Sequence, residues 1–558
     1  MANTAILQKK KKTGWMILLL LIAFTSCLED TGNYDYLEIN EVSISGINDE
    51  DTPYYTTLGD SLKIAPTLAF SLGEESEVFK YEWHLMKITT TPPRQSIGVL
   101  SDQRNLAITV GGLINAEGTY QLMYCITNLN TSVRYDHLFT LVVQDRMQVG
   151  YIMLCEKESD SFDIDLISLF RDTLTHYHNA LDIYDSELPR TGRKPIDLVC
   201  YGDNISPSVT AGGKKYAIWV LTDKSTDRVR AENLEYQPGF NLSNRLTVLD
   251  NKYRPADGNL VADRIFSIAL HSTTSGKDYL FTGGNYFFYN WAVMGWFYSF
   301  PVNTMSVSEA PYKVAPYVFM TSNGAVFFDE THNRFEAHIA GTNEIASNSA
   351  TLLRTTRLTS GAYFDWQDPD YRLLYMDNRT TTTGFAVVRN DRTGRYEFLQ
   401  MSLATAVVEG AIVIAANQIG KAEFPAGANL DNIKFFAYHN TLPYLFLASE
   451  DRVYRINTSA MTTLDDITAQ VLPAGYKVSK IKNSAIRFPR TNQIVIASYN
   501  PGGPAGENGQ LALYEVEDGT GNLKLAKHPV APTDDGYQID MKWTGLGKVI
   551  SVDYKNPQ

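Results

Sequence analysis

Hydrophobic and polar residues alternate with a period of two along most of this chain. The alternating runs are short, and Gly, Asn, Asp and Pro separate them, which is typical of strands joined by turns. We expect short helices only at Asp165–Thr175 and Ser402–Ala416. The pattern therefore predicts an all-β protein, and 558 residues suffice for two or three domains.

The N-terminal segment departs from this pattern. Lys9–Lys12 precede a ten-residue apolar run, Trp15–Phe24, which small residues join to Cys27. This order is that of a secretory signal peptide. Because a bilayer span needs about 20 apolar residues, we expect residues 1–26 to be cleaved. The alternative is an uncleaved N-terminal anchor. Residues 27–37 are polar and predict a tether.

The end of this segment resembles the lipobox of bacterial lipoproteins, with Phe24 where that pattern usually has Leu. The resemblance implies lipidation of Cys27, with palmitate among its acyl chains and about 0.8 kcal/mol of anchoring per buried CH₂. Glu29 and Asp30 resemble the surface-export signal of Bacteroidetes lipoproteins. Together these features imply a lipid-anchored outer-membrane protein that faces the cell exterior.

Residues 38–146 carry the strand pattern of an Ig-like β-sandwich. Tyr81 and Trp83 share one strand face and predict a core anchor. A later strand resembles the tyrosine-corner entry to a late Ig strand, with one face formed by Tyr120, Leu122, Tyr124 and Ile126. Residues 137–144 predict a closing strand. Since Cys125 stands alone, the Ig disulfide is missing, and the region resembles a PKD domain, a disulfide-free Ig relative.

The strand pattern changes at residue 147. In residues 147–558, clusters of predicted strands recur every 40 to 60 residues, which is the spacing of propeller blades. Apolar runs followed by polar turns predict outer hairpins at 325–331, 385–393, 453–458 and 511–516. Continuous apolar runs predict buried inner strands at 216–221, 317–320, 445–448 and 494–497. We therefore expect a β-propeller of about seven blades, with eight possible and Lys548–Val552 as the strand that closes the ring. A pair of β-sandwiches is the alternative.

The richest candidate for ligand binding is the aromatic segment 283–300. Its rings could form a platform on which a sugar ring or peptide side chain stacks. The residues expected to bind are Tyr286, Tyr289, Trp291, Trp296 and Tyr298. Asn285 and Asn290 give Tyr289 and Trp291 a polar setting, which favours an accessible loop. The alternative is that the rings fill the core between blades.

One acidic cluster and two histidine pairs are candidate metal sites. Five carboxylates could hold Ca²⁺, but they lack EF-hand spacing: Glu156, Glu158, Asp160, Asp163 and Asp165. Asp163 and Asp165 alternate with apolar residues as in a half-exposed strand, so we expect a solvated hairpin. Two histidine pairs could share strand faces, namely His176 with His178 and His332 with His338. No third ligand stands at a telling interval, so we expect no metal and no cofactor.

The net charge and the catalytic motifs that are missing exclude some classes of function. The net charge is -13, and loss of residues 1–26, with four Lys and no acid, makes it -17. Such a surface repels phosphate backbones and excludes nucleic acid as a partner. Neither a G-x-S-x-G nucleophile elbow nor a sialidase box occurs, so we expect no enzyme, although paired carboxylates need only spatial proximity. Cys125, Cys155 and Cys200 allow at most one disulfide.

The lipobox, PKD-like region and β-rich remainder together resemble the PKD-like surface lipoproteins of Bacteroidetes, which are associated with SusC/SusD-like importers. The resemblance implies a non-catalytic, nutrient-binding accessory subunit. It would capture oligosaccharide or peptide near a TonB-dependent outer-membrane transporter. The alternatives are a surface-anchored propeller-fold glycosidase or lyase, and a scaffold lipoprotein that contacts only the transporter.

Overall fold

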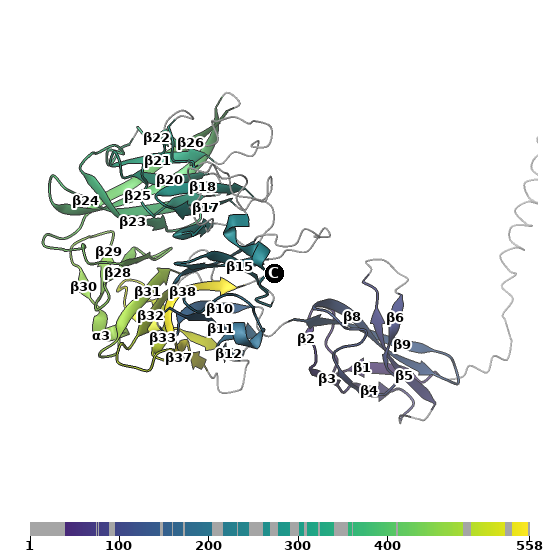
Figure 1. Ribbon diagram of the computed structural model, residues 1–558. Coiled ribbons are helices and arrows are strands. Elements are labelled where there is room, and N and C mark those ends of the chain that lie inside the picture. Colours follow the sequence, from purple (N-terminus) through teal and green to yellow (C-terminus); the bar gives the residue numbers. More distant parts are fainter. Residues whose placement is uncertain are drawn as a thin grey trace, which may run out of the picture. The chain divides into compact units, whose positions relative to one another are not determined.

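The chain divides into two compact units, residues 1–143 and 144–558, which are described separately (Figure 1). The computed structural model describes residues 39–555 except 74, 76–77, 89–94, 145–148, 159, 171–172, 203–215, 232, 245–259, 268–276, 291–300, 306–309, 322–323, 340–354, 360, 409–410, 484–492 and 530–537. The signal segment, Cys27 and the tether lie outside these residues. In the described part, no helix has the length and apolar character that a membrane span requires.

Unit 1 is built from strands alone. They are β1 (Val42–Ser45), β2 (Tyr54–Thr56), β3 (Ser61–Ile64), β4 (Thr67–Phe70), β5 (Phe79–Met86), β6 (Ser96–Ser101), β7 (Leu106–Thr109), β8 (Gly118–Asn128) and β9 (Arg134–Val143). One sheet has the order β2-β9-β8-β5-β6, while β1 pairs with β4 and β3 with β7. A single core packs side chains of these two pairs against the larger sheet, which gives the expected sandwich.

The core of unit 1 confirms the predicted anchor residues. Trp83 is 1% exposed, and its ring stacks on Tyr124 at 4.2 Å between centroids. Its indole Nε1 donates a hydrogen bond to the Gln103 carbonyl at 2.8 Å. The tyrosine corner is also present, since the Tyr120 hydroxyl donates to the Ala116 carbonyl at 2.7 Å.

Unit 2 is also all-β apart from a few short turns of helix. Its strands are β10 (Gly150–Glu156), β11 (Phe162–Phe170), β12 (Thr173–Tyr177), β13 (Pro195–Gly202), β14 (Tyr216–Thr222), β15 (Thr226–Arg230), β16 (Arg264–Ser267), β17 (Lys277–Thr282), β18 (Asn285–Asn290), β19 (Phe319–Thr321), β20 (Gly324–Asp329), β21 (Arg334–Ile339), β22 (Thr355–Arg357), β23 (Tyr371–Asn378), β24 (Thr383–Asn390), β25 (Arg395–Val408), β26 (Ala411–Glu423), β27 (Phe435–Tyr438), β28 (Tyr444–Ala448), β29 (Val453–Asn457), β30 (Asp465–Asp466), β31 (Lys477–Asn483), β32 (Gln493–Tyr499), β33 (Gly509–Val516), β34 (Leu523–Leu525), β35 (Lys527–Pro529), β36 (Gln538–Asp540), β37 (Lys542–Leu546) and β38 (Lys548–Lys555). The helical turns are α2 (Ala180–Ile183), α3 (Thr468–Val471), η1 (Pro238–Phe240) and η2 (Leu242–Asn244).

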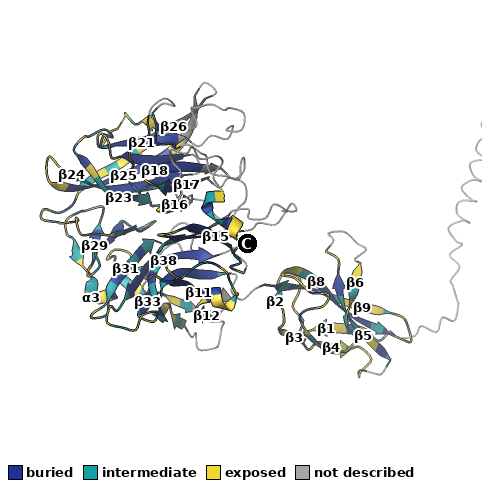
Figure 2. Ribbon diagram, in the orientation of Figure 1, coloured by how far each residue is buried: buried dark blue, intermediate teal, exposed yellow. Residues whose placement is uncertain are grey.

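The strands of unit 2 form successive antiparallel sheets. Among the described residues these are β12-β11-β10-β38, β13-β14-β15, β16-β17-β18, β19-β20-β21-β22, β23-β24-β25-β26, β27-β28-β29-β30, β31-β32-β33-β34 with β37 added, and the small pair β35-β36. Most of their strands are buried (Figure 2). The closed ring and its blade number stay predictions.

The last strand of the chain pairs with the first strand of unit 2. β38 runs antiparallel to β10 from Gly150↔Lys555 to Glu156↔Lys548. Val549, Val552 and Tyr554 of β38 pack in a core that also contains Tyr151 and Met153 of β10. The predicted pairing of the C-terminal strand with the first sheet is therefore confirmed, and it joins residues almost 400 positions apart in the sequence.

Two local predictions are wrong. The segments Asp165–Thr175 and Ser402–Ala416 are strands rather than helices, because they pair in register with neighbouring strands as β11–β12 and β25–β26. The solvated hairpin predicted for the acidic segment is correct only in part, since Glu158 and Asp160 are exposed but two other aspartates are not. Asp163 is 4% exposed and Asp165 is fully buried, since β11 lies inside its sheet with apolar side chains on both faces.

Candidate functional site

A cavity of about 200 Å³ lies in unit 2 where one edge strand from each of the seven larger sheets comes together. Its lining residues belong to β13, β16, β19, β23, β27, β31 and β38, each an edge strand of one of the seven sheets. Phe385 of β24 also contributes. Because seven separate segments contribute only a few residues each, no local motif in the sequence marks this site.

Polar side chains fix neighbouring edge strands to one another around the cavity. Asn378 of β23 accepts a hydrogen bond from Met320 N of β19 at 3.1 Å and donates to Met320 O at 2.6 Å. Asn483 of β31 donates to the Tyr438 carbonyl of β27. Asp553 of β38 accepts from Cys200 N of β13 at 2.8 Å. The walls of the cavity are therefore held by specific bonds between sheets.

Six charged side chains line the cavity in equal numbers of each sign. They are Asp197, Asp377, Asp553, Arg264, Lys480 and Lys482. Asp553 is 1% exposed, and Lys482 Nζ lies 3.6 Å from its Oδ1 while donating to the Val552 carbonyl at 2.8 Å. This pair therefore satisfies itself within the wall.

Arg264 and Lys480 are different from Lys482. Among the described residues, neither side chain has a carboxylate within 4.0 Å, and neither side chain makes a hydrogen bond. The Arg264 guanidinium lies over the Tyr317 ring, 4.9 Å from its centroid. Burial lowers the pKa of Lys480, with Arg264 and Lys482 adding to the effect and Asp197 opposing it. Two cationic groups thus face the cavity with donors to offer a ligand.

The carboxylates near these cations have different proton affinities. Burial would raise the pKa of Asp197, but Lys480, a hydrogen bond from Ser551 and Arg264 together bring it below its ordinary value. Burial raises the pKa of Asp377 despite a hydrogen bond from the Tyr375 hydroxyl at 2.8 Å. The cavity therefore combines an ionised acceptor with a carboxyl that holds its proton more tightly.

Aromatic rings complete the wall. Phe266, Phe385 and Phe436 line the cavity, and Tyr375 stacks on Phe436 with centroids 4.9 Å apart. Such rings supply apolar contact to the face of a sugar or a small side chain. A volume of about 200 Å³ holds a single sugar unit or the end of a peptide, rather than a long chain.

The predicted aromatic platform receives a correction at one position. Tyr286 is fully buried between its sheet and the next, and its hydroxyl donates to the Ala315 carbonyl at 3.0 Å. Its ring stacks on Phe327, so it fills a core rather than offering a surface. Tyr289 is part of β18, but its side chain lies outside the described residues, as do Trp291, Trp296 and Tyr298.

The two histidine pairs have different surroundings. The imidazoles of His176 and His178 lie beside each other, with ring centroids 3.6 Å apart. His332 instead contacts Asp329, with 2.6 Å between Nδ1 and Oδ2, whereas His338 contacts the Tyr279 hydroxyl through Nδ1 at 2.7 Å. The second pair is thus divided between an exposed turn and a buried contact.

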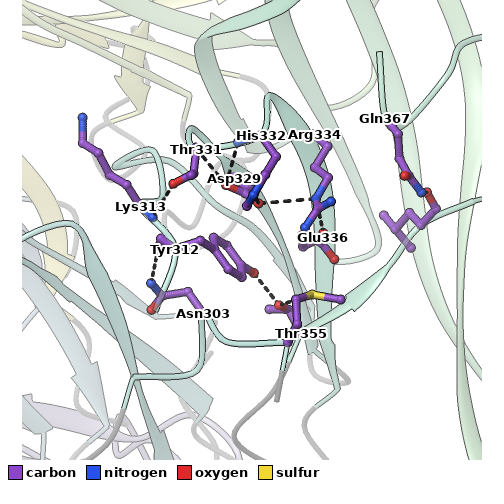
Figure 3. A network of polar contacts seen from close by, with 12 residues as sticks. Asn303, Tyr312, Lys313, Asp329, Thr331, His332, Arg334, Glu336, Thr355 and Gln367 are labelled. Carbon is purple, nitrogen blue, oxygen red and sulfur yellow. Dashed lines mark hydrogen bonds and ion pairs between the residues drawn. The ribbon is translucent and has the colours of Figure 1, made fainter. Parts of the chain in front are cut away.

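A second polar network lies in the hairpin of β20 and β21 (Figure 3). Arg334 lies between two buried carboxylates, with Nε 2.7 Å from Glu336 Oε1 and 3.3 Å from Asp329 Oδ2. Burial raises the pKa of Glu336 to about 7, with Asp329 adding to the effect and Arg334 opposing it. Glu336 therefore titrates near neutral pH.

Above pH 7, we expect Glu336→Gln to raise the free energy of unfolding by about 1–2 kcal/mol. This amount is smaller than the full pKa shift would give, because the charge of the carboxylate is screened. The folded state binds the Glu336 proton more tightly than the unfolded state does. Its contribution to stability is therefore full below about pH 4.5 and is lost as the pH rises through about 7. Urea unfolding of both proteins at pH 5 and pH 8 measures the difference. Glu330→Gln, on the same hairpin but paired with exposed Lys313, is the control. A stability gain equal at both pH values would contradict the assignment.

Comparison with solved structures finds several distant likenesses. A quinonprotein alcohol dehydrogenase-like protein from Bacteroides thetaiotaomicron is 10% identical, with 93% of this chain and 100% of that chain covered and a TM-score of 0.35. The β-propeller domain of Cps50 (Swd1) from Myceliophteria thermophila is 9% identical, with 62% and 92% covered and a TM-score of 0.31. AztD from Citrobacter koseri is 9% identical, with 85% and 100% covered and a TM-score of 0.30.

Sequence comparison gives a family for the N-terminal part. No curated protein matches the chain. The model of the PKD-like family matches residues 27–188. The match includes all of unit 1 from Cys27 onward and extends into the first sheet of unit 2. The chain therefore contains a PKD-like family domain at residues 27–188.

Proposed function

We propose that this protein is a non-catalytic surface lipoprotein that captures a small acidic nutrient in the cavity of unit 2. The observation that carries the proposal is the pair Arg264 and Lys480, whose side chains line the cavity without an ion-pair partner among the residues that the structure describes. Charge-assisted hydrogen bonds to such cations suit a carboxylate, and the guanidinium plane of Arg264 suits a bidentate contact. The ligand is an acidic sugar unit of an oligosaccharide, or the end of a peptide.

Unit 2 serves this function as a closed propeller of seven blades. The pairing of β38 with β10 and the meeting of seven edge strands at one cavity support this arrangement. In a β-propeller, every blade contributes residues to the central channel, so one ligand there can contact all the blades. In the sequence, the PKD-like region lies between Cys27 and the residues that line the cavity.

The proposed setting is the outer membrane, beside a SusC/SusD-like, TonB-dependent importer. The lipobox at Cys27 and the acids after it support the anchor and its outward orientation. Co-purification of the tagged protein from native outer membranes tests this setting. Recovery of a transporter supports it, and recovery of a transporter in the absence of any ligand binding favours the scaffold alternative.

We expect Lys480→Met to weaken the binding of an acidic ligand by about 10- to 100-fold, the effect of one lost hydrogen bond to a charged group. The measurement is calorimetric titration with galacturonic acid oligomers, and with neutral galactose oligomers as the matched probe. Short peptides form the second panel. Lys477→Met is the control, because Lys477 lies on the same strand but pairs with the exposed Glu450 and Asp451. Equal affinity for the acidic and neutral probes, or none for either panel, would refute the acidic ligand.

A surface glycosidase or lyase is the second candidate, favoured by one observation. Asp197 and Asp377 line the same cavity, and their pKa values are moved in opposite directions. Carboxyl groups separated in this way can divide the roles of base and acid. Chromatography of the oligomers after incubation with the protein discriminates the two functions. Shortened products favour an enzyme, whereas binding with intact oligomers favours a capture protein.

A further inference from the structure

The β11–β12 hairpin brings together three side chains that no sequence motif connects. β11 and β12 pair in the register Ile167↔His176 and Leu166↔Tyr177. Continuing this register by one residue places His178 opposite Asp165. Because residues two apart share a strand face, His176 and His178 both lie on the side of the hairpin that carries Asp165. The sheet thus gathers two imidazoles and a carboxylate.

The three groups surround a common point. Asp165 Oδ2 lies 3.6 Å from His176 Nε2 and 3.5 Å from His178 Nδ1. All three ligand atoms lie within 4.8 Å of one another. Bonds of about 2.0–2.1 Å to a tetrahedral zinc ion separate its ligands by about 3.3–3.4 Å. The two distances to Oδ2 are therefore slightly too long for hydrogen bonds and close to those of a metal site.

The buried carboxylate provides an independent argument. The Asp165 side chain is fully buried, yet its Oδ2 has no hydrogen-bond partner, and neither has His176 Nε2. A buried charged oxygen without a donor is costly. The other oxygen, Oδ1, is already satisfied by Asn179 N at 3.0 Å and by Lys157 Nζ at 3.2 Å. The oxygen of Asp165 that lacks a donor, Oδ2, thus faces the imidazoles of His176 and His178.

We propose that Asp165, His176 and His178 bind a divalent transition-metal ion, with Zn²⁺ as the expected occupant. Two imidazoles and one carboxylate form a ligand set that suits zinc, and three protein ligands leave a position for water. The His178 side chain is 48% exposed, so solvent reaches this position. The site lies on the outer strands of the sheet β12-β11-β10-β38, at the opposite edge from the cavity-lining β38.

The charges around the site make a directional prediction. Lys157 is the cation that faces Asp165, and its ammonium opposes a bound metal ion. Removing Lys157 therefore strengthens metal binding, whereas a purely structural role of Lys157 predicts no such gain.

The test is titration of the untagged, metal-free full chain with ZnCl₂, followed by calorimetry, and with CoCl₂, followed by visible absorption. We expect one equivalent of each ion and the spectrum of tetrahedral Co²⁺. His178→Ala lowers the affinity at least about tenfold, and Lys157→Met raises it about tenfold. His332→Ala is the matched control, because His332 is also half-exposed beside a buried aspartate, Asp329.

Two results would overturn the proposal. One is the absence of stoichiometric binding to the wild-type chain. The other is binding that His178→Ala and His332→Ala weaken equally. Since His178 is half-exposed, its replacement leaves the fold intact, and unfolding of a buried variant such as Asp165→Asn does not decide the outcome.

Discussion

Trp83→Ala is expected to destabilise unit 1 by about 3–5 kcal/mol, the cost of emptying a large aromatic site in a core. The indole is 1% exposed, stacks on Tyr124 and meets Phe139 edge-on at 5.9 Å between centroids. Its loss also leaves the Gln103 carbonyl without the Nε1 donor. Because the free energy of unfolding of a domain is only about 5–15 kcal/mol, this substitution removes a large part of the stability of unit 1.

Hydrogen exchange of peptides from residues 39–143 measures this effect within the full chain. We expect faster exchange throughout unit 1 and unchanged exchange in unit 2. Ile97→Ala on the neighbouring strand β6 is the control, since Ile97 is 57% exposed and its truncation should cost less than about 0.5 kcal/mol. Equal effects of the two substitutions would show that Trp83 is not the centre of this core.

Removal of residues 548–558 is expected to abolish cooperative unfolding of unit 2, with a loss on the order of 5 kcal/mol or more. The truncation deletes β38, whose Val549 and Val552 are fully buried in the core with β10. It also exposes the backbone edge of β10 along its whole length. Asp553 and its bond to Cys200 N are lost as well, so β13 loses a hydrogen bond to the first sheet.

Calorimetry of the truncated chain tests this prediction, and a synthetic peptide of residues 548–558 tests its cause. We expect the peptide to restore the transition, because it supplies the missing strand in trans. A peptide with Val549 and Val552 replaced by Asp is the control and should fail. A truncated chain that melts like the wild type would show that the β10–β38 pairing contributes little.

The strands were predictable from the sequence where turn residues bound an alternating run. β8 is an example, since Tyr120, Leu122, Tyr124 and Ile126 alternate and all pack in one core. The segment 402–416 was not, because its two apolar stretches, rich in Ala, Val and Ile on either side of Glu409 and Gly410, have no period that distinguishes a strand from a helix. Only its pairing, with Val408 opposite Ala411, makes it a hairpin.

The sites were harder to predict than the strands. The cavity combines residues as distant as Asp197 and Asp553, and no spacing rule connects single polar positions in seven sheets. The prediction for Tyr286 failed for the opposite reason. Its aromatic cluster is conspicuous in the sequence, but Tyr286 is a core residue. The Asp165–His176–His178 cluster had a usable signal, because reading residues 162–178 as two antiparallel strands places both histidines on the strand face that carries Asp165.

The three cysteines that the structure describes are buried and form no disulfide, with Cys125 in unit 1 and Cys155 and Cys200 in unit 2. Burial raises the pKa of Cys125 to about 12 and that of Cys155 well above its ordinary value, so the reactive thiolate is scarce in the folded chain. An alkylating reagent therefore reacts with each thiol only when its surroundings open. The protein thus carries its own reporters of local opening, one in the first unit and two in the second.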